Sequence, residues 1–158
     1  MTTLRRAFEI VLRRVLHVHW RFTRGLTLGV RAVVIDGSNR VFLIKHSYVA
    51  GWHLPGGGVE PGETLLRALG RELAEEGNIV LVEPPKLHGF FFNTSASQRD
   101  HVAVFVVRSF RQIAPPRPNY EIADHGFFPL DALPEDVTPG TQRRITEVMQ
   151  GLPAPERW

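Results

Sequence analysis

The sequence predicts an α/β protein built as a layered α/β/α sandwich around a mixed β-sheet. Several short apolar segments are bounded by turn residues, which indicates strands joined in hairpins. Two further segments carry helix start and stop signals, one in the middle of the chain and one near its end. At 158 residues, the chain is long enough to bury one core. Hairpin strands combined with two helices favour a sheet that is covered by helices.

The predicted strands follow the apolar segments along the chain. They span residues 28–35, 40–46, 80–82, 87–92, 101–108 and 122–129. A polar turn joins the first two, so we expect these to form a hairpin. Residues 47–63 are expected to be mostly loop. The final helix is expected at residues 138–150, with Thr138 as its cap and Gly151 as its stop.

The central predicted helix spans residues 64–76. Either Thr64 or Glu63 caps its start. Gly70 inside this helix lowers its intrinsic helix propensity. We therefore expect a close packing contact that requires glycine at this position.

An extra basic amphipathic helix is expected at the start of the chain. Residues 4–22 repeat apolar side chains at three- and four-residue steps. Residues 1–31 hold seven Arg and one Glu, whereas the whole chain has a net charge of only +3. We divide the chain into this helix at residues 1–24, a domain at residues 25–151 and a tail at residues 152–158. The helix either docks on the domain or on a homodimer partner, or binds an anionic membrane or nucleic acid. We favour docking.

Composition excludes several classes of protein. The chain has no cysteine, which excludes disulfides, thiol nucleophiles and cysteine-based zinc sites. No apolar run approaches the length that spans a bilayer, so we predict no transmembrane segment. The N-terminal segment interrupts its apolar residues with arginines, unlike a secretory signal. We therefore expect a cytoplasmic protein.

Three glutamates share one face of the central helix. Glu72, Glu75 and Glu76 are spaced i, i+3 and i+4, so their side chains leave the helix together. Carboxylates this close repel one another. A hard divalent cation such as Mg²⁺ prefers oxygen ligands and would offset that repulsion. The spacing therefore predicts a metal site on this helix face.

A glycine-rich turn leads into the same helix. Gly56, Gly57 and Gly58 remove side chains where the backbone bends tightly or approaches a ligand. Free N–H groups at a helix N-terminus favour anionic ligands. The turn and the carboxylates together indicate a site that holds a metal against a phosphate, with Gly57 and Gly58 as substrate contacts.

Residues 57–79 resemble the box of the Nudix hydrolases, written G-x5-E-x7-R-E-U-x-E-E-x-G-U, where U is a bulky aliphatic residue. Gly57 takes the first position, Glu63 follows after five residues, and Ile79 closes the box. The remaining matched positions are Arg71, Glu72, Leu73, Glu75 and Glu76. One position departs, because Asn78 stands where the family has glycine. The helix is expected to end there in a left-handed conformation, which Asn tolerates well.

The resemblance implies a Nudix-like fold and cleavage of a phosphoanhydride in a nucleoside diphosphate linked to another moiety. Water is the nucleophile, and Mg²⁺ or Mn²⁺ is the implied cofactor. The implied metal ligands are Glu72, Glu75, Glu76 and the backbone carbonyl of Gly56. Arg71 is implied to steer one of these glutamates. A module that binds a nucleotide without turnover is the alternative, although binding alone does not need three crowded carboxylates.

Two assignments stay open at this point. The general base is Glu72 or Glu76 inside the box, or Asp100 or Glu121 beyond it; Glu121 is equally well explained as a solvated loop residue. Trp52 either stacks on a nucleobase or packs under the glycine loop, and we favour packing.

Overall fold

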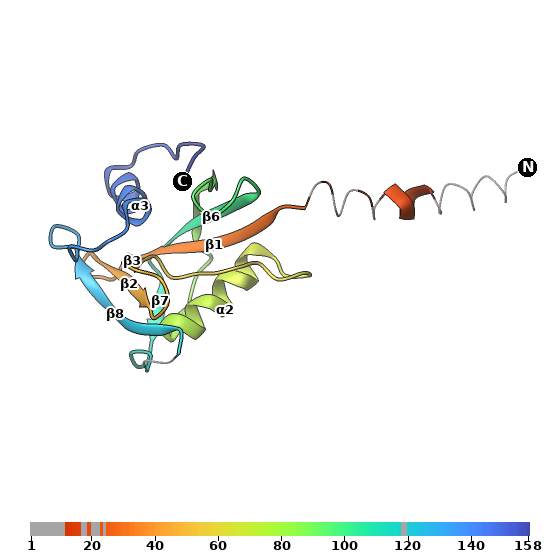
Figure 1. Ribbon diagram of the computed structural model, residues 1–158. Helices are drawn as coiled ribbons and strands as arrows, with labels where there is room; N and C mark the ends of the chain where they lie inside the picture. Colours follow the sequence, from red (N-terminus) through yellow and green to blue (C-terminus); the bar gives the residue numbers. More distant parts are fainter. Residues whose placement is uncertain (1–11, 17–18, 20–22, 24, 118–119) are drawn as a thin grey trace, which may run out of the picture.

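Helices cover opposite sides of a central group of strands in this protein (Figure 1). The computed structural model describes residues 12–16, 19, 23, 25–117 and 120–158. The strands and helices are, in chain order, β1 (Thr27–Val34), β2 (Arg40–His46), β3 (Trp52–His53), α2 (Leu65–Gly77), β4 (Ile79–Leu81), β5 (Lys86–Phe92), β6 (Asp100–Val107), β7 (Phe110–Gln112), β8 (Ile122–Pro129) and α3 (Pro139–Gln150).

The strands pair in both directions, as expected for a mixed sheet. β1 is parallel to β6, and β6 pairs antiparallel with β5. β2 lies between β3 and β8 and is antiparallel to both. A bridge between Ile35 and Val41 connects the end of β1 to β2. β4 and β7 form a separate antiparallel pair.

The core has one layer on each face of β1. Val30, Ala32 and Val34 belong to the cluster that contains the buried α2 residues Ala68, Leu69 and Leu73. Val33 and Ile35 belong to the second cluster, together with Ile145 of α3. This alternation follows the two-residue repeat of a strand that is buried on both faces. The arrangement confirms the predicted α/β/α sandwich.

Most predicted strand bounds are correct to within about one residue, and β2 and β8 match in full. The prediction missed two short strands. β3 lies within the expected loop, and Phe110–Gln112 forms β7. Both are defined by their partners, since β3 pairs with β2 and β7 pairs with β4. A segment of two or three residues carries too short a pattern to be recognised alone.

The ends of α2 follow from local chemistry. The Thr64 hydroxyl accepts a hydrogen bond from the Arg67 N–H at 3.2 Å, which confirms Thr64 as the cap. Asn78 ends the helix at φ 50°, in the left-handed conformation that the box position predicts. Thr138 and Gly151 flank α3 as expected.

The expectation that a close packing contact requires glycine at position 70 is wrong. A Cβ atom placed there would meet no heavy atom within 4 Å. We predict that Gly70→Ala stabilises the protein by about 0.5–1 kcal/mol, because alanine has the higher helix propensity. Urea unfolding measures this change. Gly77→Ala in the same helix is the matched control, because its Cβ would lie 2.9 Å from Ile79 Cδ1. Equal effects of the two substitutions would contradict the prediction.

The N-terminal helix prediction falls largely outside the described residues, since residues 1–11, 17–18, 20–22 and 24 are not among them. Residues 12–16 are helical. Leu12 and Val15 are exposed by 44% and 59%, so these two side chains do not pack on the described domain. In the described part of the chain, no helix is both long and apolar enough to cross a membrane.

Candidate functional site

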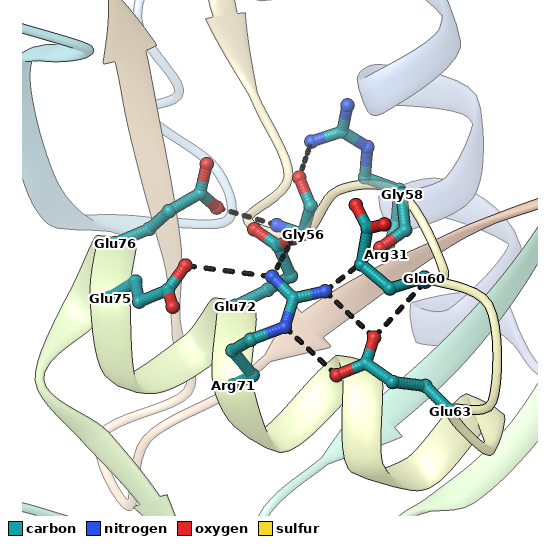
Figure 2. Close-up of polar contacts among 9 residues, drawn as sticks. All are labelled: Arg31, Gly56, Gly58, Glu60, Glu63, Arg71, Glu72, Glu75 and Glu76. Carbon is teal, nitrogen blue, oxygen red and sulfur yellow. Dashed lines mark hydrogen bonds and ion pairs between the residues drawn. The ribbon is translucent and has the colours of Figure 1, made fainter.

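The box carboxylates project from α2 toward the glycine loop (Figure 2). The three helix glutamates differ in exposure. Glu76 is buried, with 7% of the residue exposed. The side chain of Glu72 is 13% exposed, whereas that of Glu75 is 61% exposed. One helix face therefore places its carboxylates in three different environments.

Arg71 connects the helix to the loop. Its Nε and one terminal nitrogen donate to the two Glu63 carboxylate oxygens at 3.0 and 2.9 Å. Its other terminal nitrogen donates to Glu72 at 2.6 Å and lies 3.5 Å from Glu75. The Gly58 carbonyl accepts a further bond at 3.0 Å. The expected steering of a box glutamate by Arg71 is thus built into a paired, bidentate network.

Arg71 has the largest effect on the pKa of the Glu63 carboxylate. Hydrogen bonds from Arg71 lower the Glu63 pKa from an ordinary 4.5 to about 2, and the Glu60 N–H contributes in the same direction. A lowered folded-state pKa stabilises the protein above pH 4.5, and this contribution is lost as pH falls through 2.

We predict that Arg71→Met returns the Glu63 pKa toward 4.5, because the main donors to its carboxylate are removed. Carbon-detected NMR titration of the glutamate carboxyls measures the change. Arg67→Met is the matched control, since Arg67 lies on the same helix but acts on Glu63 only through charge. A Glu63 pKa that stays near 2 in Arg71→Met would contradict the network.

Glu76 is the most perturbed carboxylate of the site. Burial, together with the nearby charges of Glu72 and Glu121, raises its pKa to about 7. The Gly56 N–H, which donates to Glu76 at 2.6 Å, and the Arg31 charge act in the opposite direction. The structure therefore brings Glu121 into electrostatic contact with the box, although it lies 45 residues beyond Glu76 in the sequence.

Two glycines permit close approaches within the loop. Gly56 has φ +134°, and a Cβ there would lie 2.1 Å from the Val30 carbonyl oxygen of β1. A Cβ on Gly57 would lie 2.4 Å from a Glu72 carboxylate oxygen. Gly58 differs, because nothing lies within 4 Å of its Cβ position. The loop thus requires glycine at position 56 for contact with the β1 backbone, whereas a side chain at position 57 would displace the Glu72 carboxylate.

The sequence analysis missed Arg31. Its guanidinium donates to the carbonyl oxygens of Leu54, at 3.1 Å, and of Gly56. The Gly56 carbonyl, an implied metal ligand, is therefore engaged by an arginine. The signal was an arginine inside an otherwise apolar predicted strand, which requires a polar partner in the fold.

The three helix carboxylates do not form a closed cage. Among the residues that the structure describes, no three acidic or histidine side chains converge as a cation site. Glu72 and Glu75 are drawn to Arg71, and Glu76 is bound to the loop backbone. The donors nevertheless fit Mg²⁺ or Mn²⁺, because they are oxygens. A bound cation would also offset the burial and the neighbouring negative charges that raise the Glu76 pKa.

Two other candidates have structural partners. Trp52 is 7% exposed and packs edge-on against Phe128, with ring centroids 4.8 Å apart. This position fits the packing alternative, and we do not retain Trp52 as a substrate contact. Asp100 accepts hydrogen bonds from Thr27 at 2.7 Å and from Asn93 at 2.8 Å, which ties its carboxylate to neighbouring strand and loop residues.

A cavity of about 650 Å³ opens beside the glycine loop. Gly57 and Gly58 form part of its wall. Its other lining residues include Arg31, His53, Asn93, Thr141, Arg143 and Trp158. Its volume is within the range of pockets that hold a small molecule. A second cavity, of about 510 Å³, is lined by Lys86, His88 and the last residues of α3 and contains no box residue.

Comparison with known proteins agrees with this geometry. A family model described as NUDIX domain matches residues 25–148. An RNA pyrophosphohydrolase of Legionella pneumophila (strain Paris) is 42% identical over 52 residues, which are 33% of this chain and 30% of that protein. A putative 8-oxo-dGTP diphosphatase of Bacillus subtilis (strain 168) is 42% identical over 50 residues, 32% of this chain and 34% of that protein. The match thus spans about a third of these relatives.

Solved structures match over more of the chain. A MutT NUDIX hydrolase from Burkholderia pseudomallei superposes with a TM-score of 0.66 at 28% identity, covering 77% of this chain and 97% of that one. A NUDIX hydrolase from Nitrosomonas europaea also gives a TM-score of 0.66, at 20% identity, covering 82% and 93%. The second likeness concerns the fold alone.

Proposed function

Since this chain belongs to the NUDIX domain family, we propose that it is a metal-dependent hydrolase of nucleoside diphosphates linked to another moiety. The bond cleaved is a phosphoanhydride, and water is the nucleophile. The observation that carries this proposal is the network in which Arg71 holds Glu63 and Glu72 against the glycine loop. Glu76 lies buried on the same helix face.

In this proposal the helix glutamates bind the metal, and Arg31 and the glycine loop contact the phosphates. Glu72, Glu75 and Glu76 would hold Mg²⁺ or Mn²⁺, which when bound neutralises diphosphate charge and makes water more acidic. Arg31 lines the cavity beside the loop and presents a guanidinium, which suits phosphate oxygens. The loop at Gly57 and Gly58 allows the diphosphate to approach the backbone.

A nucleotide panel tests this proposal. It contains nucleoside triphosphates, modified triphosphates, ADP-ribose, nucleotide sugars and dinucleoside polyphosphates, each with Mg²⁺, Mn²⁺ or EDTA. We expect turnover of at least one class with metal and none with EDTA. Glu76→Gln should abolish it. Glu60→Gln is the matched control, because Glu60 is an exposed carboxylate of the same loop, and it should keep full activity.

Two outcomes would contradict the proposal. Turnover that persists in EDTA would remove the metal from the reaction. Nucleotide binding without turnover on any class would favour the alternative, a nucleotide-binding module. The location in the cytoplasm, a homodimer, and contact of residues 1–24 with a membrane or nucleic acid stay predictions.

A further inference from the structure

The last residues of the chain are packed against the domain. The Phe92 N–H at the end of β5 donates to the Glu156 carbonyl at 2.8 Å, and the Trp158 N–H donates back to the Phe92 carbonyl at 3.2 Å. Arg143 of α3 donates to the Trp158 backbone oxygen at 3.0 Å. The segment therefore bridges β5 and α3 and places Trp158 at a defined position.

The Trp158 indole contacts Phe91, Arg144 and Gly140 of the domain. Its ring meets Phe91 edge-on at 5.9 Å between centroids. The guanidinium of Arg144, which is fully buried, lies 5.4 Å from the indole centroid. The indole also covers Gly140 in the first turn of α3, where a Cβ would lie 2.3 Å from Trp158 Nε1. Glycine at this position thus makes room for the indole.

The indole is only half-buried, and Trp158 lines the cavity beside the glycine loop. Phe91 and Arg144 lie in the interior, with exposures of 0%, so Trp158 stands between these buried residues and the cavity that it lines. Gly57 and Gly58 form another part of the same wall. The cavity is therefore lined both by an aromatic residue and by the glycine loop, although no box carboxylate lines it.

We propose that Trp158 is a nucleobase contact of the substrate site, on which a purine ring stacks while the diphosphate lies at the glycine loop. This rests on the proposed function, since it assumes a nucleotide ligand. Base stacking on an aromatic side chain needs only an accessible π-face and tolerates different bases. Trp158 is partly exposed and lines the cavity, whereas Trp52 is buried in the core.

A pair of non-hydrolysable ligands tests the assignment by equilibrium binding with Mg²⁺. Guanosine α,β-methylene diphosphate carries the base, and methylenediphosphonate lacks it. Trp158→Leu keeps apolar packing but removes the aromatic ring. We expect it to weaken the nucleotide about tenfold, as loss of one stacked base does, and to leave methylenediphosphonate unchanged. Trp158→Phe should restore most of the nucleotide affinity.

The outcomes distinguish a contact with the nucleobase from a purely structural role of Trp158. Equal weakening of both ligands would mean that Trp158 only supports the fold, and an unchanged nucleotide affinity would remove it from the site. Failure of the wild type to bind the nucleotide would also overturn the assignment. Because binding is measured rather than turnover, a protein that binds nucleotides but does not hydrolyse them still supports it.

Discussion

Replacing Glu76 with Gln should stabilise the metal-free protein at a pH above 7 and abolish its hydrolytic activity. Burial, with the nearby charges of Glu72 and Glu121, raises the Glu76 pKa from 4.5 to about 7. The carboxylate therefore destabilises the fold when it ionises without a cation. Glutamine has the same shape, still accepts the Gly56 N–H through its amide oxygen, and carries no charge.

The sign of the pH dependence follows from the raised pKa. Between pH 4.5 and 7 the folded protein binds a proton that the unfolded chain has released. The stability is therefore full below pH 4.5 and is lost as pH rises through 7. The difference corresponds to about 3 kcal/mol at most.

Urea unfolding in EDTA, near pH 4.5 and above pH 7, measures this difference. Wild type and Glu76→Gln should be equally stable at the lower pH, and the variant should be more stable at the higher pH. With Mg²⁺, the wild type should gain stability and the variant should gain little, because ligand binding stabilises only a site that binds. The activity of Glu76→Gln should fall by about a thousandfold. A variant that is less stable than wild type in EDTA at the higher pH would contradict this account.

Local chemistry made the helix at the centre of the site predictable. The cap at Thr64, the left-handed exit at Asn78 and the spacing of the box carboxylates each depend on residues close together in the chain. The same applies to β2, whose continuous apolar residues follow a turn. These features need no knowledge of distant partners.

The contacts that complete the site depend on residues far apart in the sequence. Arg31 reaches Gly56 because β1 runs beside the loop, and Glu121 acts on Glu76 only once β8 is in place. The positions of the helix carboxylates also depend on such contacts, because Arg71, which also binds the loop, pairs with Glu72 and lies near Glu75. Trp158 likewise reaches the cavity through pairing with Phe92.

We propose Glu121 as the general base, so Glu121→Gln should lower kcat by about a hundredfold while changing KM little. Its charge acts on Glu76, and the Ser47 N–H donates to its backbone carbonyl at 2.9 Å, which fixes the chain just before β8. Asp100 is a weaker candidate, because its carboxylate accepts bonds from Thr27 and Asn93.

The split between kcat and KM provides a readout that a purely structural role for Glu121 would not reproduce. Loss of the base lowers kcat and leaves KM unchanged, whereas a distorted site would change both. Asp124→Asn is the matched control, since Asp124 is an exposed carboxylate on β8, the strand that follows Glu121, and the variant should keep both kcat and KM. If Glu121→Gln keeps kcat within about twofold, the base is a box glutamate or Asp100. The Glu121 charge would then act only by raising the pKa of Glu76. Glu121→Gln should in that case increase the fraction of ionised Glu76 near neutral pH.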